Sequence, residues 1–261
     1  MPVFAANLTM LFTEAQFLDR FAAAREAGFR HVEYLFPYAH APELLAKLLK
    51  DNGLEQVLFN LPAGDWAAGD RGIACDPARV DEFRAGVPRA VEYARALGVA
   101  NVNCLAGKIP AGVSPEACRD ALVENIRFAA DAFADEGLTL LVEFINRKDI
   151  PGFFLHGTAQ TLSVIDEAGR ANVRLQYDVY HAQREEGEIA ATLGAHMGRI
   201  GHVQVADNPG RHQPGTGELN YPFIFAELDR LGYRGHVGLE YIPRPDTSES
   251  LGFIGRMGYS L

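Results

Sequence analysis

Short apolar runs and amphipathic stretches alternate along the whole chain. Eight runs rich in β-branched and aromatic residues predict buried strands at 3–8, 31–36, 54–62, 101–107, 139–146, 173–181, 200–207 and 236–243. Apolar residues at helical spacing fill most of the stretches between them, and several of these stretches close at a glycine such as Gly28, Gly53, Gly98 or Gly232. Helices are therefore predicted around 14–28, 42–53, 79–97, from 114, from 158, near 185–197, at 222–231 and in a short C-terminal segment.

Regular alternation of strand and helix predicts a parallel sheet, and eight repeats predict that the sheet closes into a (β/α)8 TIM barrel. Such a barrel needs about 250 residues, so the 261 residues are predicted to form one barrel domain over 1–261. An open doubly wound sheet is the competing architecture. It is expected to carry a glycine-rich phosphate turn after the first strand, and none follows Leu8.

Four of the apolar runs in the second half each carry one oxygen-bearing side chain near the C-terminal end. These residues are Glu143, Asp178, Gln204 and Glu240, and the spacings of 35, 26 and 36 residues between them match one strand–helix unit. Side chains alternate across a strand, so turning these four inward sends their neighbours toward the helices, among them Val142, Phe144, Val203, Leu239 and Tyr241. The same phase points Asn7, Glu33, Asn60 and Asn103 inward on the first four strands.

Carboxylates are rarely buried unless they are paired or bind a metal. One reading pairs each carboxylate with a neighbouring lysine or arginine inside the barrel. The other reading, which we favour for four residues at matched strand ends, is a site for a hard divalent cation, Mg²⁺ or Mn²⁺, with Glu143, Asp178, Gln204 and Glu240 as ligands. A ketone oxygen and an adjacent hydroxyl bound to such an ion acidify the C–H between them, and Glu143 and Glu240 could then move protons between two carbons.

Four further residues are candidates for contact with a substrate. His181 lies three residues beyond Asp178, and Lys108 and Arg211 lie in loops that follow strands, where a carboxylate-bearing substrate would bind. Trp66 is the only tryptophan and lies in the longest irregular segment, which suggests a lid. The alternative for each is a structural role, as a packed histidine or tryptophan or a solvated cation.

Composition narrows the classes of partner. The net charge of −10 disfavours nucleic acid, whose binding rests on lysine and arginine. Cys75, Cys104 and Cys118 form no CxxC pair and are odd in number, so reduced thiols in a cytoplasmic enzyme are expected. No apolar run is long enough for a membrane helix, and the N-terminus has no basic leader.

Five segments of the chain resemble the hydroxypyruvate isomerase family, one of the xylose isomerase-like barrels that also include ketose 3-epimerases. The segments are LPAGDWAAGDRGIAC (61–75), ARALG (94–98), IPGF (150–153), YDVYH (177–181) and VADNPGRHQPGTGELN (205–220). The resemblance spans nearly the whole chain, and the 61–75 loop is its most specific part. It implies that Glu143 and Glu240 are the catalytic pair, that the four strand-end residues hold the metal, and that His181 and Arg211 contact substrate.

The reaction implied is the interconversion of hydroxypyruvate and 2-hydroxy-3-oxopropanoate (tartronate semialdehyde) through a metal-bound enediolate. The family pattern Glu-Pro-Ile-Asn-His reads Glu143-Phe144-Ile145-Asn146-Arg147 here. Phe144 is expected to face the helices, and Arg147 to place a fixed positive charge at the barrel mouth.

The reading from sequence leaves other substrates open, namely a 2-oxo-tetronate with one more carbon or a ketose for 3-epimerisation. More remote alternatives are a metal-dependent nuclease and a ligand-binding barrel without catalysis. Related barrels often form homo-oligomers, and the sequence leaves the oligomeric state open.

Overall fold

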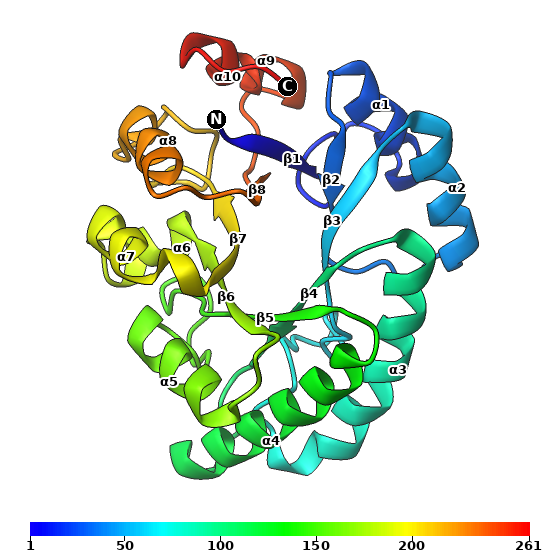
Figure 1. The fold of residues 1–261 in the computed structure, drawn as a ribbon, viewed down its shortest axis with the longest axis vertical. Coiled ribbons are helices and arrows are strands. Elements are labelled where there is room, and N and C mark those ends of the chain that lie inside the picture. The colour runs from blue at the N-terminus through cyan, green and yellow to red at the C-terminus, as the bar shows by residue number, and fades with distance from the viewer.

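The strands form a closed parallel barrel in sequence order, as predicted. A computed structural model describes residues 1–261 and places around one axis (Figure 1) the strands β1 (Val3–Asn7), β2 (His31–Glu33), β3 (Glu55–Asn60), β4 (Asn101–Leu105), β5 (Thr139–Glu143), β6 (Val173–Asp178), β7 (Ile200–Val205) and β8 (His236–Leu239). Strand β1 pairs in parallel with both β2 and β8, which closes the sheet.

Helices surround the barrel on its outside (Figure 1). They are α1 (Arg20–Glu26), α2 (Pro42–Asn52), α3 (Val80–Leu97), α4 (Pro115–Ala134), α5 (Thr158–Ala168), α6 (Val179–Glu185), α7 (Ile189–His196), α8 (Tyr221–Arg230), α9 (Thr247–Ser250) and α10 (Gly252–Arg256). Helices α2 and α3 end at Gly53 and Gly98, whose left-handed backbone favours glycine. None of these helices combines the length and the apolar character needed to cross a membrane.

The strands are shorter at their C-terminal ends than the apolar runs predict. The sixth run was expected to stay extended to 181, but helix α6 begins at Val179. The cause is the side chain of Asp178, whose Oδ1 accepts a hydrogen bond of 2.8 Å from the backbone N–H of Tyr180 and caps the helix. The helix expected near 185–197 is therefore two helices, α6 and α7, and His181 lies in the first turn of α6 rather than on a strand.

The barrel wall separates an apolar layer from a polar interior. The outward-facing residues predicted from strand alternation, including Val142, Phe144, Val203 and Leu239, all belong to the large apolar cluster between sheet and helices. The apolar cluster inside the barrel is small and consists of Ala5, Val57, Leu58 and Leu141. TIM barrels usually fill this space with branched apolar side chains. Here buried polar residues take much of it, including Asn7, Glu33, Asn60, Asn103, Gln176, His202 and Gln204.

Two histidine rings are in contact at the N-terminal end of the barrel, opposite the strand ends that carry the predicted ligands. The ring centroids of His31 and His236 are 4.3 Å apart. Burial, and after it the neighbouring His31 and His202, lower the pKa of His236 to about 4, against the opposing effect of Glu33. His236 is therefore neutral in the folded protein at neutral pH.

This depressed pKa predicts a loss of stability in acid. The unfolded chain takes up a proton near the ordinary histidine pKa of about 6.5, whereas the folded protein resists it, so stability present above that pH falls between about 6.5 and 4. Replacing His236 with phenylalanine is expected to make urea unfolding midpoints less pH-dependent across this window. An unchanged slope in the variant would show that other groups cause the acid sensitivity.

Candidate active site

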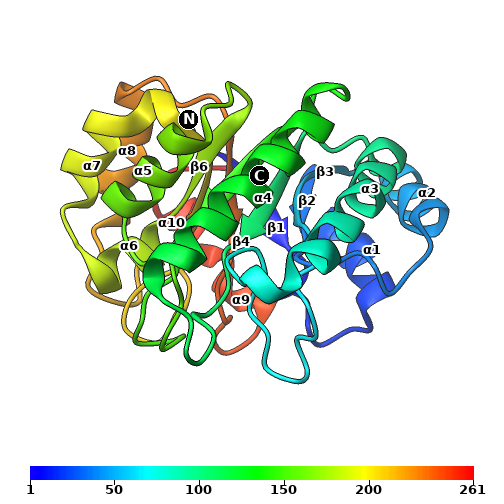
Figure 2. The same cartoon turned by 90° about the horizontal axis from the view of Figure 1, so that it is seen from below.

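A cavity of about 100 Å³ lies at the C-terminal ends of the strands and is lined by Trp66, Glu143, His181, Arg211 and Glu240 among the predicted site residues. Apolar side chains complete its wall, namely Leu35, Leu105, Ile145 and Ile150. The loops that follow the strands gather on this side of the barrel, among them the long loop drawn in cyan between β3 and α3 (Figure 2). This is the face on which TIM-barrel enzymes carry their active sites.

Strand ends β5 and β6 place two carboxylates and one imidazole within reach of a single ion. Glu143, Asp178 and His181 are all buried and each offers one ligand atom, all within 4.8 Å of one another. Glu143 ends β5, and its Oε2 accepts a hydrogen bond of 2.9 Å from Asn103 Nδ2 on β4. Asp178 uses Oδ1 to cap α6, which leaves Oδ2 to face the site.

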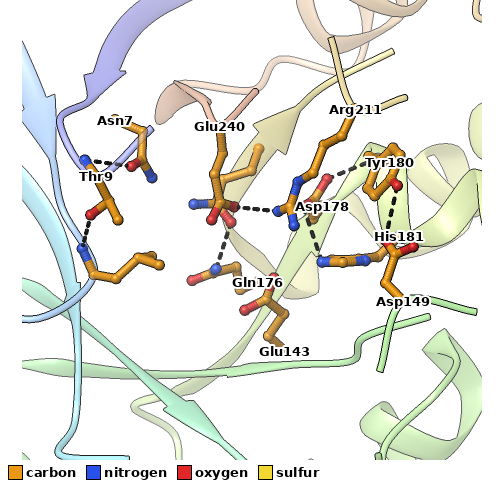
Figure 3. A network of polar contacts seen from close by, with 12 residues as sticks. Asn7, Thr9, Glu143, Asp149, Gln176, Asp178, Tyr180, His181, Arg211 and Glu240 are labelled. Atoms are coloured by element: carbon orange, nitrogen blue, oxygen red, sulfur yellow. Dashed lines mark hydrogen bonds and ion pairs between the residues drawn. The ribbon is translucent and has the colours of Figure 1, made fainter. Parts of the chain in front are cut away.

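A guanidinium group lies between Asp178 and Glu240 (Figure 3). Nη2 of Arg211 is 3.3 Å from Asp178 Oδ2 and 3.2 Å from Glu240 Oε2. Arg211 has a left-handed backbone with φ of 56°, and its guanidinium carbon lies 5.1 Å from the centre of the Tyr180 ring. The backbone conformation and the aromatic face both hold the cation against the carboxylates.

Three buried carboxyl groups lie close together here, and burial raises the proton affinity of each. Burial raises the pKa of Glu143 well above its usual range, and the charges of Glu240 and Asp178 add to the shift. Burial also raises the pKa of Asp178 and of Glu240, while Arg211 opposes both shifts. A cation at this point relieves the repulsion among all three.

Residues of the loop after β5 determine which nitrogen of His181 carries the proton. Nδ2 of Asn146 lies 2.7 Å from His181 Nδ1. The orientation of the Asn146 amide is fixed, because its oxygen accepts from Arg184 Nε and from the backbone N–H of Asp149, and its nitrogen also donates to the Asp149 carboxylate. Nδ1 of His181 therefore accepts and Nε2 carries the hydrogen.

The pKa of His181 is lowered well below 6.5, first by burial and then by Arg211 and Arg184, so the ring is neutral. A neutral ring with its hydrogen on Nε2 donates toward the cavity, 3.5 Å from Asp178 Oδ2. This tautomer suits a hydrogen bond to a substrate oxygen better than a bond to a metal ion.

Gln204, the remaining predicted ligand, lies on β7 and is fully buried. Its Nε2 donates to Glu33 Oε1 at 2.7 Å, and its Oε1 accepts from Gln176 Nε2 at 2.7 Å. A carboxamide oxygen has two lone pairs, so one remains for a cation. The ligand atoms that converge belong to Glu143, Asp178 and His181. Gln204 and Glu240 add oxygen donors of the kind that a hard divalent ion prefers, and the Arg211 guanidinium lies in contact with both Asp178 and Glu240. The residues present thus fit such an ion.

Two of the predicted substrate contacts differ in their placement. Trp66 lines the cavity and packs on Phe36 with ring centroids 5.1 Å apart, while 38% of its surface remains exposed. The structure does not bring Lys108 to the cavity wall, because its side chain is exposed and Nζ donates to the carbonyl of Gly69. Lys108 thus ties the loop after β4 to the loop after β3.

The two residues that depart from the family pattern, Phe144 and Arg147, do not line the cavity. Phe144 faces the helices as expected and packs edge-on against Tyr177, with ring centroids 6.2 Å apart. Arg147 keeps the fixed positive charge that was expected, but its Nε donates to Glu185 Oε1 at 2.7 Å, so the charge is paired, and Arg147 does not line the cavity.

The loop that carries Trp66 is anchored by a close backbone approach. Gly72 forms a bridge with Ala106, has φ of 107°, and leaves no room for a side chain, because a Cβ there would overlap the carbonyl of Leu105. Gly69 in the same loop has φ of 102° and open space around its Cβ position. A side chain would strain the backbone at both positions, and the two positions differ in packing.

Gly72→Ala is therefore expected to destabilise the protein by about 2 kcal/mol more than Gly69→Ala, because only the first adds an overlap to the strained backbone. Chemical denaturation of both variants measures the difference. Equal losses in the two variants would show that the contact between the loops after β3 and β4 contributes nothing to stability.

Comparison with known proteins agrees with this geometry. The sequence pattern of the xylose isomerase-like TIM barrel family matches residues 21–257. The chain belongs to this family. A hydroxypyruvate isomerase of Escherichia coli K12 is 53% identical to it over 95% of this chain and 96% of its own. A 2-oxo-tetronate isomerase of Cupriavidus necator is 49% identical over 97% and 98% of the two chains.

Solved structures with the same fold agree with the sequence comparison. A structure described as AP endonuclease, family 2, from Brucella melitensis superposes with a TM-score of 0.96 at 44% identity, over 98% of this chain and 99% of its own. A D-allulose 3-epimerase from Methylomonas superposes with a TM-score of 0.76 at 25% identity, over 100% and 91% of the two chains. The prediction of an isomerase on a xylose isomerase-like barrel is confirmed.

Proposed function

We propose that this isomerase interconverts hydroxypyruvate and 2-hydroxy-3-oxopropanoate, with Glu143 and Glu240 as the proton-transfer groups. The observation that carries the proposal is two buried glutamates on different strands lining one small cavity, each with a raised pKa. A raised pKa makes an ionised carboxylate a stronger base and brings its proton affinity closer to working pH.

The reaction moves one hydrogen from C3 to C2. One glutamate removes a proton from C3 of hydroxypyruvate while the C2 carbonyl becomes an enediolate oxygen. The other glutamate returns a proton to C2. The proton of the C3 hydroxyl passes to the oxygen on C2, so that C3 becomes the aldehyde and C2 carries the hydroxyl. Glu143 and Glu240 contribute from β5 and from the end of β8, so they approach the bound substrate from different sides.

Mg²⁺ or Mn²⁺ held by Glu143, Asp178, Gln204 and Glu240 would polarise the substrate's carbonyl and hydroxyl oxygens and acidify the C3 hydrogen. His181 Nε2–H donates to a substrate oxygen at the same end of the cavity. Arg211, whose guanidinium carries a fixed charge next to Asp178 and Glu240, would bind the substrate's carboxylate. Trp66 lines the cavity and would limit the access of water to it.

Cavity size favours a short substrate. A volume of about 100 Å³ is well below the 300–1,000 Å³ typical of sites for drug-sized molecules. It suits a three-carbon acid better than a ketohexose. A four-carbon 2-oxo-tetronate is the second candidate, because a relative of that name is 49% identical.

Incubation with hydroxypyruvate and Mn²⁺ in D₂O tests the proposal. We expect an aldehyde product by NMR, deuterium at C2 and loss of both effects in EDTA. Parallel assays with a 2-oxo-tetronate and a ketohexose rank the substrates by kcat/KM. Conversion of neither 2-oxo acid would reject the proposed reaction.

The description of the Brucella structure introduces a different candidate, a nuclease. The net charge of −10 weighs against a polyanionic substrate. Cleavage of abasic DNA, without turnover of a 2-oxo acid, would favour the nuclease instead.

A further inference from the structure

One buried carboxylate inside the barrel, Glu33, has no role in the proton transfers. Glu33 on β2 is 1% exposed, and its side chain does not line the cavity. Three donors surround it: Asn7 Nδ2 at 2.9 Å, Gln204 Nε2 at 2.7 Å and His202 Nε2 at 2.7 Å. Burying a carboxylate costs several kcal/mol even when it is hydrogen-bonded, so its presence at the barrel centre calls for a function.

Strand β8 leaves room for this carboxylate. Every second residue of β8 faces the barrel interior, beginning with His236 and continuing through Gly238 to Glu240, which directly follows the strand. Gly238 is the register partner of Gln204. A Cβ at Gly238 would lie 2.5 Å from both carboxylate oxygens of Glu33. Its backbone φ is outside the left-handed range, so the space for Glu33, and not backbone conformation, accounts for glycine here.

The hydrogen bond between Glu33 and Gln204 fixes which end of the Gln204 carboxamide faces Glu33. A carboxamide carries an oxygen at one end and an NH₂ group at the other, and only the oxygen can bind a cation. Glu33 accepts from the NH₂ end, and Gln176 donates to the oxygen end. Rotation of the amide by half a turn would set two oxygens against each other at Glu33 and two NH₂ groups against each other at Gln176, so the pair excludes the reversed amide.

We propose that Glu33 is a positioning residue that holds the Gln204 carboxamide with its oxygen available to a divalent cation, in a space that Gly238 keeps open. The inference rests on the proposed metal site and adds to it a residue that does not touch the ion. Partners that orient the ligands of a metal typically change its affinity by about 10–100-fold when they are removed.

The test measures Mn²⁺ affinity of the intact protein by calorimetry, without substrate. Glu33→Leu removes the acceptor and adds no donor, and it is expected to weaken Mn²⁺ binding at least about tenfold. Gly238→Ala keeps the carboxylate but displaces it, and is expected to weaken binding in the same way. Melting temperatures of the metal-free variants identify any that fail to fold.

Two controls separate orientation from charge. Glu33→Gln loses the charge but retains a carbonyl oxygen that can accept from Gln204, so its affinity is expected to stay within about threefold of wild type. In Glu33→Leu/Gln204→Glu both ends of residue 204 are oxygens, so orientation no longer matters and affinity is expected to recover. If Glu33→Gln loses as much affinity as Glu33→Leu, the charge matters and the positioning role is wrong.

Mn²⁺ binding by the wild-type protein distinguishes failure of this inference from failure of the proposed metal site. A wild-type protein that binds no Mn²⁺ overturns the metal site together with this inference. Wild-type binding that Glu33→Leu and Gly238→Ala leave unchanged overturns only the role of Glu33.

Discussion

Glu143→Gln and Glu240→Gln are each expected to lower kcat for hydroxypyruvate by about 10³-fold. Glutamine keeps the size of the side chain but cannot accept a proton, and a positioned acid or base contributes about 10²–10⁴-fold. The two variants are expected to differ in D₂O. The variant that keeps the C3 base exchanges substrate hydrogen with solvent without forming product, whereas the other shows neither exchange nor product.

Glu124→Gln is the matched control, because Glu124 is exposed on α4 and pairs only with Arg127 at the surface. It should retain wild-type turnover. Turnover within about threefold of wild type in both site variants would contradict the assignment of Glu143 and Glu240 as the proton-transfer pair.

Arg211→Met is expected to cost about 3–5 kcal/mol of unfolding free energy in EDTA at pH 9. Removing one partner of a buried ion pair leaves the other charge uncompensated, and here Asp178 and Glu240 both lose theirs. The loss should be smaller near pH 6, because burial raises the pKa of both carboxyls, that of Glu240 to about 8, and protons neutralise them once the opposing Arg211 is gone. Urea denaturation at the two pH values measures both effects.

Mn²⁺ is expected to restore part of the stability lost in Arg211→Met, since a ligand that binds only the folded state stabilises it. Arg211→Lys retains the charge and should fall between wild type and Arg211→Met. A stability loss that neither Mn²⁺ nor pH changes would show that Arg211 acts by packing alone.

The sequence was sufficient to predict the barrel and the inward-facing set. Strand alternation of period two placed Glu143, Asp178 and Glu240 on one face, and glycines such as Gly53 and Gly98 predicted where helices end. Both signals are local, so they can be read without knowing the fold. The apolar run of 173–181 forms a strand only as far as Asp178, because the side-chain cap at Asp178 outweighed the propensity of Val179 and Tyr180 for a strand.

Contacts between residues distant in sequence could not be predicted in the same way. Arg147 meets Glu185 across 38 positions, and Glu33 meets Gln204 across 171. The backbone of Arg211, with φ of 56°, carries no recognisable signal in the sequence. Asn146 sets the tautomer of His181, but the sequence identifies it only as a loop residue. Its role depends on where Arg184 and Asp149 lie in three dimensions.

Anomalous diffraction from a crystal containing Mn²⁺ and hydroxypyruvate would locate the ion and the substrate together. We expect one manganese peak bound by oxygens of Glu143, Asp178, Gln204 and Glu240, with Arg211 moved from between Asp178 and Glu240 toward the substrate's carboxylate. C3 and C2 of the substrate should each lie within proton-transfer distance of one of the two glutamates. A manganese ion bound elsewhere, or a substrate whose two carbons face neither Glu143 nor Glu240, would contradict this expectation.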